Sequence, residues 1–223
     1  MSQAPPLRKP TQRPCLRLSG IDWQTYSRLL FAFAEKPSIK LTYDRGELEI
    51  MSPRLDHDDD GRFLGRMVLV LTEELGLPVK GGGSTTLRRR LKKRGIEADD
   101  CFWIANAQRM AGRRRLDLRT DPPPDLAIEV DVTCSSLDRL SIYASIKVPE
   151  IWRLESDVLT FYAFGPDGRY TAIAHSRTFP QVAPADLLGF LQKARKADDE
   201  NAVIREFREW IRKPHEANGG SQG

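Results

Sequence analysis

The stretch Asp99-Asp100-Cys101-Phe102-Trp103-Ile104, with its counterpart Leu126-Ala127-Ile128-Glu129-Val130-Asp131, decides the fold of this chain. Each contains an apolar run of the length of a short buried strand, and a polar, proline-rich connection separates them. If the two pair as a hairpin, the start of the first lies beside the end of the second, so Asp99 and Glu129 come together. Mg²⁺ prefers hard oxygen ligands, so the pattern predicts a divalent-metal site at this end of the hairpin.

Two further acids flank this pair. Asp131 lies on the strand of Glu129, two residues further on, and is a candidate for a third carboxylate ligand. Asp125 begins the same strand, roughly 13 Å from Glu129 at about 3.3 Å per residue. Asp125 is therefore the weaker candidate.

The chain also resembles a known family in several short segments that occur in a fixed order. These are Asp44-Arg45-Gly46-Glu47-Leu48 with Met51-Ser52-Pro53 and His57, Gly95-Ile96-Glu97-Ala98-Asp99, Pro124-Asp125-Leu126-Ala127-Ile128-Glu129-Val130, Tyr143-Ala144, and Val148-Pro149-Glu150-Ile151-Trp152. Together they are similar to the Uma2 family of endonucleases, also known as DUF820, in the PD-(D/E)XK superfamily. Each segment is weakly specific alone, but the ordered set spans most of residues 17–190.

The resemblance implies an α/β fold of the α+β type, with a restriction-endonuclease-like core in which helices flank a central mixed β-sheet. It implies an endonuclease that hydrolyses phosphodiester bonds of DNA with Mg²⁺ or Mn²⁺. The implied metal ligands are Asp99, Glu129 and Asp131, and the other implied catalytic residues are Arg139, His57 and Glu47. By analogy with restriction enzymes, two copies of the chain can pair as a homodimer.

The chain departs from the superfamily pattern at the lysine expected two positions after the Glu, where it has Asp131. In many Uma2 sequences a lysine stands instead on the following helix, four residues before a Tyr. The matching residue here is Arg139, before Tyr143. Arginine keeps the positive charge and can grip a phosphate, but it does not readily lose a proton, so we expect Arg139 to stabilise charge rather than act as a base.

Positive charge is concentrated in one part of the sequence. Residues 80–119 contain twelve Lys and Arg residues against four acids, whereas the net charge of the whole chain is +4. The densest run consists of Arg88, Arg89, Arg90, Lys92, Lys93 and Arg94. Nucleic acids bind through neutralised phosphates, so this run is a candidate nucleic-acid-binding segment. The alternative is a solvated hairpin tip.

The remaining pattern predicts the elements around the hairpin. Helical spacing is found over residues 22–35, 58–75 and 137–146, and short strands are expected over residues 150–154, 158–164 and 170–174. Residues 39–50 read as a hairpin that places Glu47 and Glu49 on one face, from which one of them could reach the metal. His57 lies in the acid-rich first turn of a helix, where capping is the alternative role.

Composition predicts one globular domain. We expect a disordered tail over residues 1–16, the nuclease-like domain over 17–192, an amphipathic helix over 193–214 that packs on the domain or on a partner, and a disordered tail over 215–223. The chain lacks an apolar run of the ~18 residues that a membrane helix needs, and its N-terminus lacks a leader-like apolar region. The three cysteines have neither CxxC nor zinc-site spacing, so we expect no disulfide framework and a cytoplasmic location.

Two functional hypotheses follow. The first is the metal-dependent nuclease, in which an activated water attacks phosphorus. The second is a catalytically inactive nuclease-fold module that binds nucleic acid or a protein, which the missing lysine favours. A glycoside hydrolase with paired carboxylates is disfavoured because the sequence supplies no aromatic-lined sugar cleft.

Overall fold

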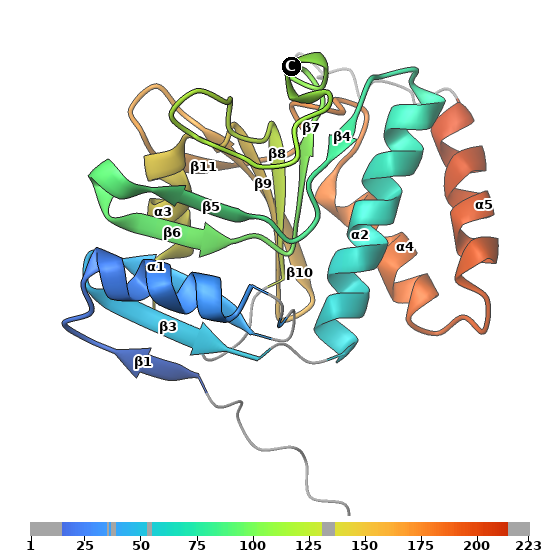
Figure 1. The fold of residues 1–223 in the computed structure, drawn as a ribbon. Helices are drawn as coiled ribbons and strands as arrows, with labels where there is room; N and C mark the ends of the chain where they lie inside the picture. The colour runs from blue at the N-terminus through green and yellow to red at the C-terminus, as the bar shows by residue number, and fades with distance from the viewer. Residues whose placement is uncertain (1–14, 35, 37–38, 53–54, 131–136, 214–223) are drawn as a thin grey trace, which may run out of the picture.

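The computed structural model describes residues 15–34, 36, 39–52, 55–130 and 137–213, with the side chains of residues 55–58 excepted. Two β-sheets share an apolar cluster, and helices lie on the outer face of each sheet and between the two (Figure 1). The architecture is a mixed α/β fold, as the sequence predicts. The expected mixed sheet is present, and a separate five-stranded antiparallel sheet is an addition to the prediction.

The first sheet has five antiparallel strands and carries helix α1 (Trp23–Ala32) on one face. In spatial order its strands are β1 (Leu16–Leu18), β3 (Glu47–Met51), β2 (Lys40–Asp44), β6 (Arg94–Glu97) and β5 (Thr86–Arg89). Asp22 caps α1 by accepting a hydrogen bond from the Thr25 N–H at 2.6 Å. Tyr26 of α1 packs on Leu41, Tyr43 and Leu48, which fixes the apolar face of the β2–β3 hairpin.

The opposite face of the β2–β3 hairpin carries its polar residues. Lys40 pairs with Met51, Thr42 with Glu49, and Asp44 with Glu47. Residues directly opposite each other in an antiparallel pair share a face, so all six side chains leave the sheet on the side away from α1. That side is turned towards α3 (Arg139–Ile146), which lies behind the sheet in Figure 1.

The second sheet has six strands and contains the predicted hairpin. In spatial order they are β11 (Tyr170–Ile173), β10 (Val158–Phe164), β9 (Glu150–Glu155), β8 (Leu126–Val130), β7 (Asp100–Trp103) and β4 (Lys80–Gly81). Strands β7 and β8 are antiparallel, with Asp100 opposite Ile128, which confirms the predicted pairing. Strands β8 and β9 are parallel and joined through α3, so the sheet is mixed.

Three helices form a layer on one face of this second sheet. They are α2 (Leu55–Glu74), α4 (Pro184–Ala194) and α5 (Glu200–Arg212), on the right in Figure 1. Alternate residues of β8, Ile128 and Val130, belong to the apolar core beneath them. Phe207 and Ile211 of α5 are buried in the same core, so the last helix packs back on its own domain. Two short 3₁₀ turns, η1 (Arg90–Lys92) and η2 (Gln108–Met110), complete the elements.

Ala98 and Asp99 form the link between the two sheets, because β6 ends before them and β7 begins after them. Helix α2 packs closely on this link. A Cβ atom on Gly61 would lie 3.4 Å from Cβ of Asp99, and a side chain on Gly65 would collide with the Asp100 carboxyl group. The structure therefore fixes Asp99 from three sides: the first sheet, the second sheet and α2.

Some local expectations need correction. The helix expected from residue 137 begins at Arg139 and is capped by Asp138, which accepts from the Ser141 N–H at 3.1 Å. Cys101 is a buried free thiol, but Cys15 is disulfide-bonded, which the expectation of no disulfide framework did not anticipate. Within the described part of the chain, no helix has the length and apolar character needed to cross a membrane.

Candidate active site

Asp99 lies beside the strand that carries Glu129. Its backbone N–H donates to the Ile128 carbonyl at 3.2 Å, and its carboxylate Oδ2 accepts from the Val130 N–H at 2.6 Å. The two bonds reach the residues before and after Glu129, so they hold Asp99 beside Glu129. Sequence reasoning predicted this adjacency from the hairpin, and the pairing of β7 with β8 produces it.

Glu129 is almost completely buried, with 1% of its surface exposed. It alternates with Ile128 and Val130, so its side chain leaves β8 on the face opposite the three-helix layer. The Tyr143 hydroxyl donates to Oε2 at 2.6 Å, and Nη1 of Arg139 contacts Oε1. Arg139 and Tyr143 are four residues apart on α3 and therefore share one face of that helix. Burial raises the pKa of Tyr143 well above its ordinary value, which keeps this phenol protonated as a donor.

Arg139 stands between two buried carboxylates. Besides Glu129 it faces Glu49, whose Oε1 lies 3.7 Å from Nη2, and the same nitrogen lies 3.5 Å from Sδ of Met51. Glu49 is 1% exposed and Arg139 is 6% exposed. A guanidinium keeps its charge under all ordinary conditions, so Arg139 neutralises part of the negative charge gathered here.

Lys40 is the residue that sequence reasoning missed. It begins β2, is 8% exposed, and its Nζ contacts Oδ1 of Asp99. A buried lysine is rare unless it is paired. The signal was present in the alternation of β2, because Leu41 and Tyr43 face the core and Lys40 must face the other side, but nothing in the sequence places Asp99 there.

The paired carboxylates have the donor chemistry of a divalent-cation site. Both offer hard oxygens, and an oxygen that accepts one hydrogen bond keeps a second lone pair. Mg²⁺ is commonly held by one or two carboxylates plus waters, so Asp99 and Glu129 fit its requirements. Among the residues that the structure describes, no group of three or more His, Cys, Asp or Glu side chains is arranged to hold a metal. In the structure, Lys40 contacts Oδ1 of Asp99 and Arg139 contacts Oε1 of Glu129.

The other predicted site residues are placed differently. Glu47 bonds with Arg17 and Ser19, at 2.9 Å in each case, so the structure brings Glu49 of the predicted pair to Arg139 and leaves Glu47 towards the turn. His57 falls in the first turn of α2, and its side chain lies outside the described residues. Asp131 also lies outside the described residues.

Asp100, next to Asp99, has a perturbed titration. Burial against α2 raises its pKa to about 6, from an ordinary value of 3.8, although the Cys101 N–H donates to its Oδ1 at 2.8 Å. Desolvation disfavours the charged form, and it outweighs the hydrogen bonds here. The carboxyl group therefore gains its charge near pH 6 instead of near pH 4.

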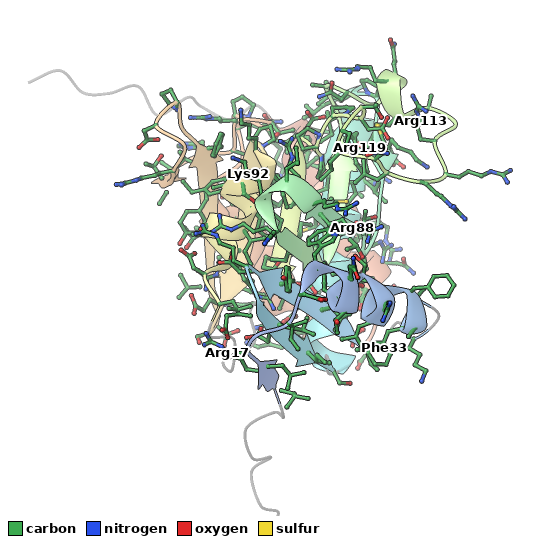
Figure 2. The ribbon with its side chains drawn as sticks, turned by 60° about the vertical axis from the view of Figure 1, so that its left-hand side comes forward. Arg17, Phe33, Arg88, Lys92, Arg113 and Arg119 are labelled. Carbon is green, nitrogen blue, oxygen red and sulfur yellow. The ribbon has the colours of Figure 1, made fainter. Side chains whose placement is uncertain are left out.

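The basic run occupies the end of β5 and the turn η1 that follows it, and Figure 2 shows Arg88 and Lys92 on the face turned to the viewer. Arg88, Arg90, Lys92 and Lys93 are exposed, as a phosphate-binding role requires. Arg94 is different, because it is buried and its Nε donates to Oδ1 of Asp44 at 2.7 Å. The structure thus assigns Arg94 to holding β6 against β2 and leaves the exposed cations facing solvent.

Comparison with known proteins identifies the family. One matching solved structure is described as a "putative nuclease belonging to DUF820" from Anabaena variabilis; it shares 14% identity with a TM-score of 0.49, and the match covers 73% of this chain and 98% of that one. No curated protein matches. The family model described as "Putative restriction endonuclease" matches residues 23–193. This match spans most of the sequence, and the chain therefore belongs to the Uma2 family.

Proposed function

We propose that this protein is a nuclease that hydrolyses phosphodiester bonds of DNA and depends on Mg²⁺ or Mn²⁺. The observation that carries the proposal is the hydrogen bond from the Val130 N–H to Asp99, which holds one carboxylate beside Glu129 on the neighbouring strand. Two acids held this way, with two buried cations against them, supply both the ligands and the charge that phosphodiester hydrolysis needs.

Asp99 and Glu129 are the residues that would hold the ion, and Asp131 would be a third ligand. When bound, the ion supplies Lewis acidity and a more acidic water. Tyr143 orients Glu129 by its hydrogen bond to Oε2. The alignment of this carboxylate therefore depends on α3.

Lys40 and Arg139 have the complementary role of stabilising negative charge. Each is buried and held against a carboxylate by its own strand or helix, so its position is set before substrate arrives. A fixed cation in a site that excludes water stabilises developing charge on phosphate oxygens more than it would in bulk water. Arg139 acts through its charge, because it does not readily give up a proton.

A second candidate function rests on the same contacts. Both oxygens of Glu129 and both oxygens of Asp99 already have partners within the protein. A self-neutralised centre of this kind, without the lysine expected at position 131, suits a module that keeps the nuclease fold and binds nucleic acid without cutting it.

Cleavage assays combined with calorimetry distinguish the two functions. Purified protein is incubated with supercoiled, linear and single-stranded DNA and with RNA, in Mg²⁺, in Mn²⁺ and in EDTA, and Mg²⁺ and Mn²⁺ binding is measured in parallel. The nuclease proposal expects cutting of DNA that EDTA abolishes. Intact substrates together with no heat of metal binding would decide for the binding module.

A further inference from the structure

Two open hollows flank Arg45 at the turn between β2 and β3. The first, of about 700 Å³, lies towards α1, and its cationic lining is Arg45, Arg90 and Lys93. The second, of about 610 Å³, lies towards α3, and its cationic lining is Arg45, Lys92, Arg94 and Arg169. Arg45 belongs to both, so we call the two together the Arg45 groove.

Most of these cations are available to a ligand. Arg90, Lys92, Lys93 and Arg169 have no ion pair within the described part of the chain. Arg94 and Arg45 share a single acid, Asp44, at 2.7 Å and 3.4 Å. The acids that line the hollows are Asp22 and Asp138, and each already caps a helix by accepting a backbone N–H. The groove therefore carries a clear excess of positive charge.

Backbone contacts hold two of the cations of the groove in place. The Arg45 N–H donates to the Lys93 carbonyl at 2.9 Å, which ties the β2–β3 turn to the basic run. Arg45 and Lys93 both have left-handed backbone, with φ of 49° and 50°. Glycine or asparagine is favoured at such positions, and a residue with a longer side chain is disfavoured. Two cations therefore occupy the tied positions at some conformational cost.

The groove is connected to the candidate active site by short structural paths. Lys40 and Asp44 are the two ends of β2, which places the groove roughly 13 Å from Lys40 at about 3.3 Å per residue. Arg94 donates to the Ser141 carbonyl of α3 at 2.8 Å, and α3 carries Arg139 and Tyr143. A separation of ~13 Å corresponds to about four base-pair rises of 3.4 Å along a duplex.

We propose that the Arg45 groove binds the phosphate backbone of nucleic acid at a position several nucleotides from the cleaved bond. The inference rests on the proposed function and extends it to Arg45 and Arg169, which lie outside the basic run of residues 88–94. Leu91, 98% exposed at the tip between the cations, favours a macromolecule over a small anion. An extended backbone presents several phosphates to the two hollows and apolar sugar surface to this leucine.

The variants that test the groove are Arg45→Gly and Arg169→Ala. Glycine is suited to the left-handed backbone at position 45, so Arg45→Gly removes the charge without backbone strain. Arg205→Ala on α5 is the matched control. Arg205 and Arg45 have side chains that are both 66% exposed, and each pairs with one Asp, at 3.3 Å and 3.4 Å. Binding of each variant to a random-sequence 30-base-pair duplex is measured in EDTA across a salt series.

Each groove variant is expected to reduce the slope of log Kobs against log salt by ~0.9, whereas Arg205→Ala leaves the slope unchanged. Equivalently, between 50 and 200 mM salt each groove variant loses about 3.5-fold less affinity than wild type. Slopes equal to wild type for both groove variants would overturn the inference. Binding of inorganic phosphate to the groove without any displacement of the duplex would overturn it as well. The assay is independent of cutting, so duplex binding with the expected slopes but no cleavage would contradict only the nuclease proposal.

Discussion

The two ends of strand β8 both carry buried carboxylates, but these are satisfied in different ways. At the start of the strand, Asp125 accepts from the N–H groups of Ile104 and Asn106, at 2.7 Å and 3.0 Å. At its end, Glu129 contacts the side chains of Arg139 and Tyr143. The first end uses neutral donors, most of them in the backbone, and the second uses side chains, one of them charged.

The same contrast holds for their neighbours. Glu150 starts β9 beside Asp125, and it accepts from Nε1 of Trp152 at 2.7 Å and from Thr178. Asp99, beside Glu129, contacts the ammonium group of Lys40. Backbone donors cannot leave without unfolding, whereas a side-chain cation can turn towards an arriving phosphate. The difference suits one end of the strand to stability and the other end to the chemistry proposed for this protein.

The largest expected effect is on Glu129. Glu129→Gln should lower DNA cleavage by about 100-fold or more, because it removes a charge that both the ion and Arg139 require. The amide keeps the size of the side chain and can still accept from Tyr143, so the fold should survive. Cleavage rates at saturating DNA, with circular dichroism as the control for folding, test this. A rate close to wild type would remove Glu129 from the centre.

Asp125→Ala should have the reverse profile. It leaves buried N–H groups without acceptors, which we expect to lower the free energy of unfolding by about 3 kcal/mol. Cleavage per folded molecule should not change. Urea denaturation and rate measurements at low temperature check both parts. A loss of cleavage in fully folded Asp125→Ala protein would break the comparison between the two ends.

Substitution of Arg139 sharpens the comparison further. Arg139→Lys keeps the charge and adds a group that can exchange a proton, so the rate should be retained or raised. Arg139→Ala should depress the rate by about tenfold or more and should also destabilise the fold, because it leaves Glu129 and Glu49 buried without their cation. If Arg139→Lys and Arg139→Ala lowered the cleavage rate equally, the rate would depend on the shape of the guanidinium group and not on its charge.

The ion pair between the exposed Arg212 and the half-buried Glu74 gives the smallest of these effects. Arg212 and Arg208 lower the pKa of Glu74 below its ordinary value of 4.5. The resulting stability is present above pH 4.5 and is lost as the pH falls through the folded-state pKa. Arg212→Ala should therefore shift the urea midpoint slightly at pH 7, and the shift should shrink towards pH 3.5. A shift as large as that of Asp125→Ala would mean that the helical layer depends on its surface charges.

The hairpin at the centre of the fold could be predicted because its signals are local. Short apolar runs identify β7 and β8, and antiparallel pairing then brings Asp99 next to Glu129. Helices α1 and α2 were evident from the spacing of their apolar residues. The separation of the strands into two sheets was not predictable. Only Ala98 and Asp99 lie between β6 and β7, and no local signal there shows that these two strands belong to different sheets.

The cations of the centre depend on contacts that no local pattern encodes. Lys40 reaches Asp99 only because the first sheet folds against the second. The choice of Glu49 over Glu47 depends on how far along β3 the start of α3 docks. The sequence predicts two carboxylates with Arg139 as the cation beside them, and the structure adds a second cation, Lys40, on Asp99.

The link at Ala98 and Asp99 has a consequence for folding kinetics. Lys40 and Asp99 are 59 positions apart in sequence, and Arg139 and Met51 are 88 apart. Contacts across such distances require large loops to close first, so they form slowly. We therefore expect refolding protein to regain its secondary structure before the contacts of the candidate active site. We also expect partial unfolding to break these contacts while most of each sheet is still intact.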